Sequence, residues 1–201
     1  MKAILARKIG MTNYFSEKGE IVPVTLVEAG PCTVTQIKSM DKDGYEAVQL
    51  GFGSAKKISK PLKGHLKISK AQPKYLQEVK INTENIKVGD EITCNIFDEG
   101  EKINVSGLSK GKGFAGTIKR HGFHRGPMTH GSRNQRKPGS IGAMYPQHVF
   151  KGMKMPGQMG HTRVTVKNLK VGKIDKENNI LAIQGAVPGA KKTLLLIRSV
   201  G

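Results

Sequence analysis

The chain contains no acidic residue between Glu101 and Asp175, an interval that holds fifteen Lys and Arg residues. The core of this interval, residues 106–163, carries twelve of the 25 glycines and only scattered bulky side chains such as Phe114 and Tyr145. Such a segment neither neutralises its own charge nor surrounds a core of its own. It is too long to be an ordinary solvated face. It is therefore either disordered or completed by a strongly anionic partner.

The whole chain has the same bias, with a formal net charge of +19 over 201 residues. An excess of this size opposes compaction and attracts polyanions, so nucleic acid is the first partner to consider and an anionic membrane surface the second. Cys32 and Cys94 form no C-x-x-C pair, which favours a reduced, cytoplasmic protein. Arg7 and Lys8 interrupt the apolar start of the chain, and no run is long enough for a membrane span. We expect an intracellular protein with no membrane partner.

Short β-branched or alternating runs on both sides of the basic interval predict strands. The predicted strands are residues 21–29, 32–39, 45–52, 76–81, 90–97, 163–175, 178–187 and 193–200. Asp43-Gly44 predicts a hairpin turn, and residues 176–179 predict another. Because long amphipathic helical patterns are absent, we expect a mainly β protein whose two flanks pair into one barrel. Seven lysines without an acid predict a surface loop at about 54–75.

Gly111, Gly113 and Gly116 form the pattern G-x-G-x-x-G, which is typical of dinucleotide-binding sites. That site also needs a preceding strand, a following helix and an acidic residue ~20 positions later. Gly122 and Gly126 follow too soon for a good helix, and no acid occurs before Asp175. The glycines are better explained as positions where backbone lies close to a partner.

Five histidines of the interval raise the possibility of zinc, but their spacing is poor and no thiolate or carboxylate is local. They are His121, His124, His130, His148 and His161. Serine and histidine are also present without a carboxylate to orient an imidazole, which most catalytic triads need. We therefore expect no metal, no cofactor, no small-molecule substrate and no enzymatic activity. The remaining interpretation is a loop that becomes ordered inside folded RNA, where Lys and Arg neutralise phosphates and aromatic rings stack on bases.

A longer pattern, F-x6-N-x2-G-x-S-x-G-K-G-x2-G-x3-R, runs from Phe97 to Arg120. It resembles the signature of the third large-subunit ribosomal protein, a universal family, in its bacterial form. The resemblance continues through KIGMT, DGYEAVQLGFG, THGS, PGSIG, VFKGMKMPGQMG, RVTVKNL and GAVPGA, in the order of the family and over nearly the whole chain.

The resemblance implies a translation-factor-like β-barrel with a long, glycine-rich, basic extension looped out of it. The barrel would comprise residues 1–105 and 164–201, and the extension residues 106–163. It further implies a structural constituent of the large ribosomal subunit that binds near the 3′ end of the large-subunit RNA and helps to nucleate assembly. The implied neighbours are the fourteenth and nineteenth large-subunit proteins. The distinct alternative is a free-standing RNA-binding protein or RNA chaperone.

The extension is expected to bind ribosomal RNA through its cationic and histidine side chains and to approach the peptidyl-transferase centre with its tip. The expected RNA-binding residues are Lys110, Lys112, Lys119, Arg120, His121, Arg125, His130, Arg133, Arg136, Lys137, Lys151, Lys154 and Arg163. The expected tip residues are Gly142, Ala143, Met144, Tyr145 and Pro146. Some bacterial relatives carry a methylated Gln two positions before the tip proline. Met144 occupies that position here, so the modification is not carried over.

Overall fold

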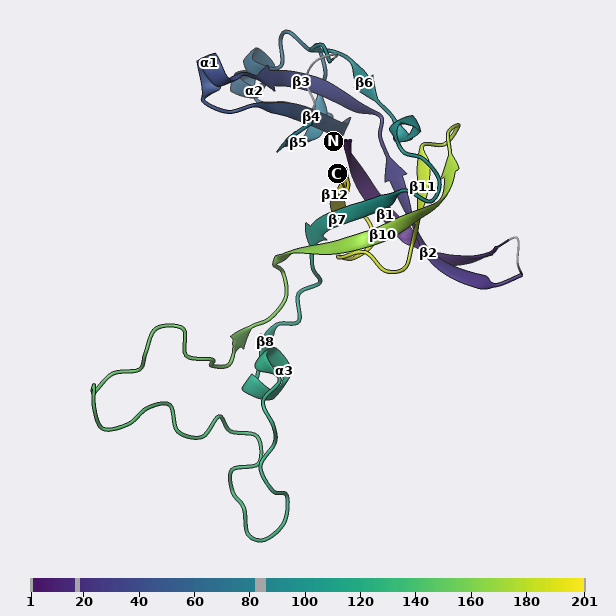
Figure 1. Cartoon of the computed structure of the whole chain (residues 1–201). Coiled ribbons are helices and arrows are strands. Elements are labelled where there is room, and N and C mark those ends of the chain that lie inside the picture. Colours follow the sequence, from purple (N-terminus) through teal and green to yellow (C-terminus); the bar gives the residue numbers. More distant parts are fainter. Residues whose placement is uncertain (1, 17–18, 82–85, 201) are drawn as a thin grey trace. The chain divides into compact units, whose positions relative to one another are not determined.

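The computed structural model describes residues 2–16, 19–81 and 86–200 (Figure 1). The chain divides into two compact units. Met1–Leu108 and Arg163–Gly201 form the first unit, and Ser109–Thr162 form the second. Residues 106–108 and Arg163, which the sequence assigns to the extension, lie in strands of the first unit. Strands predominate over helices in the described residues, which confirms the mainly β class.

Six antiparallel strands of the first unit close into a barrel in the order β1-β12-β7-β10-β11-β2. They are β1 (Ala3–Phe15), β2 (Ile21–Ala29), β7 (Lys102–Leu108), β10 (Arg163–Asp175), β11 (Ile180–Gln184) and β12 (Leu194–Ser199). β12 pairs with both β1 and β7, and β7 pairs with β10. The barrel is therefore built from both ends of the chain, and its closure gives each of these strands two paired neighbours.

Four other strands of the first unit form a second sheet in the order β5-β4-β3-β6. They are β3 (Cys32–Lys38), β4 (Ala47–Ser54), β5 (Pro73–Val79) and β6 (Glu91–Ile92). The prediction that the flanks build a single barrel is thus wrong for this part of the chain. The chain leaves the barrel at Gly30, where φ is 92° and an added Cβ would lie 3.0 Å from the carbonyl oxygen of Ile92. Glycine is the residue that such a turn accommodates without strain.

The structure also differs from two local predictions. β3 and β4 form a hairpin, but the connection is helix α1 (Met40–Asp43), which ends at Gly44 with φ 77°. Within residues 90–97 only β6 is a strand, and the 3-10 helix η1 (Cys94–Ile96) follows it. Cys94 and Phe97 are both buried. Residues three apart share a face of a helical turn but not of a strand, so burial of both side chains favours the turn.

The sequence patterns do not predict β1 or β7. β1 contains Arg7 and Lys8, and a charged pair inside an apolar run obscures alternation. Lys8 is nevertheless only 8% exposed, and its ammonium donates to the carbonyls of Val187 at 3.0 Å and Gly189 at 3.2 Å. A buried cation needs such partners, and they come from a loop that is remote in sequence.

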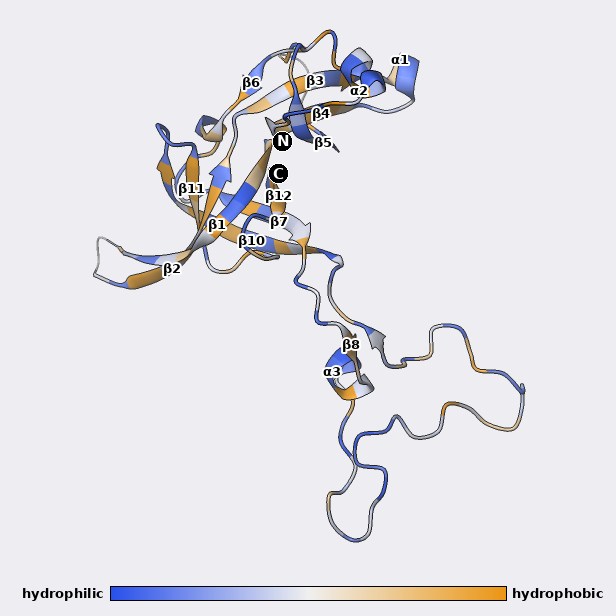
Figure 2. Cartoon of the chain, turned by 180° about the vertical axis from the view of Figure 1, so that it is seen from behind, coloured by the Kyte–Doolittle hydropathy of each residue, from blue (hydrophilic) through white to orange (hydrophobic). Residues whose placement is uncertain are grey.

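Branched aliphatic side chains from both sheets form one core in the first unit. Hydrophobic residues concentrate in the strands of this unit (Figure 2). Fully buried members of the cluster include Ile4, Leu5, Val34, Val48, Leu50, Ile103, Leu195 and Ile197. Because barrel and second sheet share this cluster, burial of apolar area stabilises them together.

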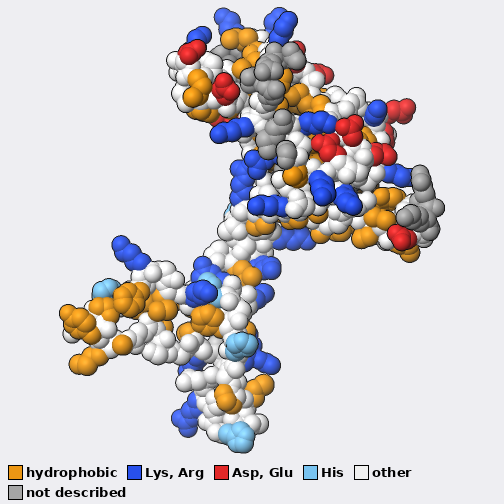
Figure 3. All heavy atoms as spheres, viewed as in Figure 1, with side chains coloured by type: hydrophobic (Ala, Val, Ile, Leu, Met, Phe, Trp, Pro, Cys, Tyr) orange, Lys and Arg blue, Asp and Glu red, His pale blue; other side chains and the backbone are white. Residues whose placement is uncertain are grey.

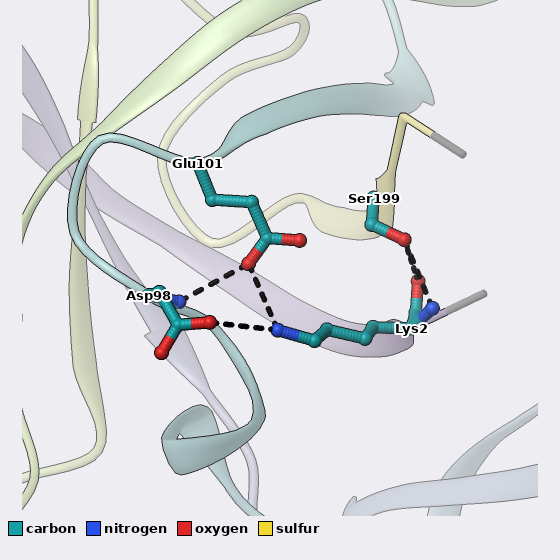
Figure 4. A network of polar contacts seen from close by, with 4 residues as sticks. All are labelled: Lys2, Asp98, Glu101 and Ser199. Carbon is teal, nitrogen blue, oxygen red and sulfur yellow. Dashed lines mark hydrogen bonds and ion pairs between the residues drawn. The ribbon is translucent and has the colours of Figure 1, made fainter.

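A polar network ties the two ends of the chain to the barrel (Figure 4). The backbone N–H of Lys2 donates to the Ser199 hydroxyl at 2.9 Å. The Lys2 ammonium contacts Asp98 at 2.9 Å and Glu101 at 3.2 Å. The hydrogen bond to Asp98 is the main cause that raises the Lys2 pKa. These contacts fix the start of β1 beside the end of β12 and the entry to β7.

Both cysteine side chains are fully buried, and we expect them to be unreactive in the native protein. Burial raises the pKa of the Cys32 thiol from 9.0 to about 12, and it also raises the pKa of Cys94. At pH ~8 the thiolate fraction of Cys32 is about a thousandfold below that of an unfolded thiol. Iodoacetamide labelling, followed by mass spectrometry, should be slower by at least that factor in buffer than in denaturant. Equal rates would contradict the burial of Cys32.

The same shift predicts a loss of stability at alkaline pH. Above pH 9.0 the unfolded thiol loses its proton while the folded thiol keeps it until about 12. The unfolded state then binds fewer protons, so the free energy of unfolding falls as pH rises through this window. Urea melts of the wild type and of Cys32→Ala should show a shallower alkaline decline in the variant.

Candidate nucleic-acid interface

The second unit, Ser109–Thr162, is fully described and contains no carboxylate side chain. In Figure 3 its surface carries Lys, Arg and His side chains beside hydrophobic ones, with no Asp or Glu among them. Its Lys and Arg side chains are exposed. Cations that have no internal counter-charge leave the unit with a one-sign field, which attracts a polyanion.

Paired chain segments form the base of the unit. The N–H of Ser109 donates to the carbonyl of Thr162 and that of Lys112 to Met159, each at 2.9 Å. β8 (Phe114–Ala115) pairs with β9 (Gly157–Gln158). At Gly160, φ is 73° and an added Cβ would collide with the carbonyl of Lys110. Lys110 and Lys112 therefore project from an ordered backbone.

Helix α3 (Thr117–His121) carries the next cations and ends at Gly122, where φ is 73°. Arg120 Nη1 donates to the carbonyl of Met155 at 2.7 Å, and His121 Nε2 lies 2.9 Å from the same oxygen. Both side chains thus hold the returning segment against α3. Lys119, in the same helix, is exposed to solvent. The structure therefore gives Arg120 and His121 a positioning role that their charge alone does not reveal.

A closed loop follows α3. The N–H of Gly126 donates to the carbonyl of Gln135 at 3.0 Å, and a Cβ at Gly126 would collide with the carbonyl of Asn134. The chain reverses at His130 and Gly131, whose φ angles are 58° and 72°. Arg125, Arg136 and Lys137 flank this loop, and His130 and Arg133 lie within it; all five are exposed. The hydrogen bond that closes the loop joins backbone groups nine residues apart in sequence.

The expected tip residues lie in a stretch of local hydrogen bonds. The Ser140 hydroxyl donates to the carbonyl of Gly142 at 3.0 Å, and His148 Nδ1 lies 2.9 Å from the carbonyl oxygen of Pro146. Met144 is 91% exposed and Tyr145 is 85% exposed. Large side chains that are exposed to this degree gain no stabilisation from burial of their apolar surface. Because Tyr145 presents an open aromatic face, it suits stacking on an unpaired base.

The geometry also bears on the competing interpretations. The two-residue strand β8 lies inside the glycine pattern, between Gly113 and Gly116, and the five-residue helix α3 follows, so the pattern is not part of a βαβ unit. In the part of the chain that the structure describes, no three His, Cys, Asp or Glu side chains gather as a metal-binding group. None of the helices of these residues combines the length and hydrophobicity needed to cross a membrane.

Not every expected site residue lies in the second unit. Lys151 and Lys154 belong to its returning segment, whereas Arg163 begins β10 in the first unit, opposite Leu108. Further along β10, exposed lysines extend the positive surface of the barrel, although the site prediction omits them. They are Lys167, Lys170 and Lys173. The signal that identifies them is the acid-free interval itself, which reaches as far as Asp175.

Comparison with known proteins identifies the class. The family model described as "Ribosomal protein L3" matches residues 65–180. The "Large ribosomal subunit protein uL3" of Carboxydothermus hydrogenoformans is 55% identical over 201 residues, which cover 98% of this chain and 96% of the relative. The protein of the same name from Pelotomaculum thermopropionicum is 54% identical, with 98% and 96% coverage. That from Herpetosiphon aurantiacus is 54% identical, with 98% and 95% coverage.

The match spans nearly the full length of both chains and is far above the level at which families are ambiguous. The chain belongs to the ribosomal protein L3 family, in its bacterial form. The resemblance that the sequence motifs indicate is thereby confirmed.

Proposed function

We propose that the chain is a structural constituent of the large subunit of the cytoplasmic ribosome and that it binds ribosomal RNA mainly through its second unit. The observation that carries the proposal is a unit of defined backbone with exposed cations and no carboxylate. The counter-charge that this surface needs is supplied by an RNA backbone. The names of the relatives, which place them in the large ribosomal subunit, support the same function.

Finer features of the proposal come from the family resemblance. The barrel is of the translation-factor-like kind, and residues 106–163 act as the extension that penetrates the RNA. Binding near the 3′ end of the large-subunit RNA nucleates assembly, and the fourteenth and nineteenth large-subunit proteins are neighbours. The protein performs no catalysis of its own. Exposed cations fix the position of the unit on phosphates, which carry little sequence information.

Within the second unit we assign two kinds of contact. The cationic stem, defined as residues 109–137 and 151–162, supplies phosphate contacts through exposed side chains such as Lys119, Arg125 and Arg133. The tip, residues 142–146, carries no charged side chain and supplies shape and stacking contacts towards the peptidyl-transferase centre. Arg120 and His121 keep the stem closed through Met155.

Replacing Arg133, Arg136 and Lys137 with Ala should weaken the salt dependence of RNA binding. Each lost phosphate contact removes slightly under one unit from the slope of log K against log salt, so the slope should fall in magnitude by up to ~3. The measurement is a salt titration of binding to protein-free large-subunit RNA. The control replaces the exposed Lys42, Lys80 and Lys87, each within three residues of an acid, and should hardly change the slope. An unchanged slope in the first variant would mean that its three side chains face solvent.

The test of the function as a whole is co-sedimentation. The protein should remain with large subunits through a high-salt wash, because its contacts are buried in folded RNA. Release of the protein at moderate salt, with RNA binding intact, would instead favour a free-standing RNA-binding protein.

A further inference from the structure

A second cationic surface lies on the first unit, away in sequence from the acid-free interval of the second. No acid occurs between Glu46 and Glu78, and seven lysines lie from Lys56 to Lys74. All of these residues are described, and they connect β4 to β5 through helix α2 (Lys60–His65). The segment contains Lys and His but no Arg.

Helix α2 and the turn that follows it position three of these lysines. After α2 the turns continue, since the N–H of Leu66 donates to the carbonyl of Leu62 and that of Lys70 to Leu66, each at 3.0 Å. Lys60 and Lys63, spaced i and i+3, lie on one side of α2. Lys67 lies in the turn that follows the helix, where its N–H donates to the carbonyl of Gly64 at 3.3 Å. Leu62 and Leu66, spaced i and i+4, lie on another side, and Leu66 is 3% exposed.

This segment borders a hollow of about 650 Å³. Four lysines line it together with Gly64, Leu66 and Gln72; these are Lys60, Lys63, Lys67 and Lys70. The ion pairs of residues 2–16, 19–81 and 86–200 are formed by Lys2, Arg7 and Lys38 and include none of the four. Four lysine side chains therefore line one hollow, and none of them is compensated by an ion pair with a carboxylate in the part of the chain that the structure describes.

The segment is anchored to the second sheet, so the lysines do not belong to a loose loop. His65 Nε2 lies 2.9 Å from Gln49 Oε1 on β4. The N–H of Ala55 donates to the carbonyl of Gln72 at 2.9 Å, which closes the base of the segment. The Ser69 hydroxyl donates to the carbonyl of Leu66 at 3.2 Å. Anchoring reduces the conformational freedom that a ligand would otherwise have to remove.

We propose that this lysine-lined hollow is a second RNA-binding site, which holds backbone phosphates independently of the second unit. Lysine binds phosphate as a point charge, without the bidentate geometry of arginine, so the site fixes position on RNA and reads no base sequence. The inference rests on the proposed function in one respect, namely that the polyanion is RNA. An anionic membrane fits less well, because a membrane-surface helix needs an exposed apolar face, and in this segment Leu66 is buried and Ile68, at 80% exposed, is a single apolar side chain.

The test uses the full chain with Lys60, Lys63, Lys67 and Lys70 all replaced by Gln. The probe is protein-free large-subunit RNA, titrated between ~50 and ~200 mM salt. We expect the slope of log K against log salt to fall in magnitude by up to about 3.5, at slightly under one unit per lost phosphate. The matched control replaces Lys42, Lys80, Lys87 and Lys176, which are exposed and lie within three residues of an acid. It removes the same net charge and should change the slope by less than about one unit.

Hydroxyl-radical footprinting locates the contact. The variant of the hollow should lose protection of an RNA stretch that the Arg133, Arg136 and Lys137 variant still protects. Slopes and footprints equal to those of the control would overturn the site while leaving the proposed function intact. A wild-type protein with no salt-dependent RNA binding would overturn both.

Vesicles of phosphatidylserine and phosphatidylcholine form the last arm of the test. We expect no binding of wild type that depends on the four lysines. Lysine-dependent vesicle binding with an unchanged RNA slope would overturn the RNA assignment. Circular dichroism melts should be the same for both quadruple variants and wild type, because all eight lysines are exposed.

Discussion

Replacing Lys119, Arg125 and Arg133 together with Gln is expected to exclude the protein from assembled large subunits when wild type competes. All three side chains are exposed on the cationic stem. At about 1.5 kcal/mol for each charge-assisted contact, three lost contacts correspond to roughly a thousandfold in affinity. Arg120 is left in place because its loss would also release the Met155 carbonyl. The measurement is the ratio of variant to isotope-labelled wild type in purified subunits.

The matched variant deletes residues 143–147 at the tip and should enter subunits nearly as well as wild type. This stretch contains no Lys or Arg, so phosphate attraction is not its contribution. The deletion should instead alter peptide-bond formation, or the sensitivity of the ribosome to drugs that act at the peptidyl-transferase centre. If the tip deletion prevents incorporation while the stem variant assembles normally, the assignment of roles along the second unit is wrong.

A second large effect is expected in the barrel. Replacing Ile197 with Ala should lower the free energy of unfolding by about 3 kcal/mol, within the range of 2–5 for such truncations. Ile197 is 0% exposed and lies on β12, opposite Ile4 on β1 and Val105 on β7. Its loss opens a cavity where three strands meet. Urea denaturation followed by circular dichroism measures the change.

The control for the barrel is the same substitution at Ile21, which is 64% exposed on β2. Truncating this exposed side chain removes little buried apolar surface and leaves no closed cavity. The free energy of unfolding should therefore change by less than about 0.5 kcal/mol. Comparable losses in the two variants would show that burial on β12 does not determine the stability of the barrel.

Local patterns were sufficient for the strands whose sequences alternate or are β-branched. β2, β10 and β12 lie within a residue of their predicted ranges. The patterns do not predict β1, because Lys8 looks like a surface residue in the sequence and its carbonyl partners, Val187 and Gly189, are remote. The strand predicted over residues 90–97 is wrong for the opposite reason. Their composition suits a strand, but the burial of both Cys94 and Phe97 favours a helical turn.

In the candidate interface, too, some features could be predicted from the sequence and others only from the structure. The exposed cations could be named from the sequence because charge belongs to the residue type and is independent of neighbours. The contacts of Arg120 and His121 with the carbonyl of Met155 could not be predicted, because Met155 is more than thirty positions away from both residues. The hollow beside α2 could not be predicted either. The sequence shows seven lysines, but only the folded chain places four of them around one space.

The sequence by itself determined the charge, the acid-free interval, the mainly β character and the family, because each of these depends on residue types and their order. Only the tertiary structure decided which strands close the barrel and which form the second sheet. Ala3 pairs with Arg198, and Leu108 pairs with Arg163. These partners are separated by most of the chain or by a whole unit. Strand pairing depends on backbone hydrogen bonds and shared burial between such distant segments, and no local pattern contains that information.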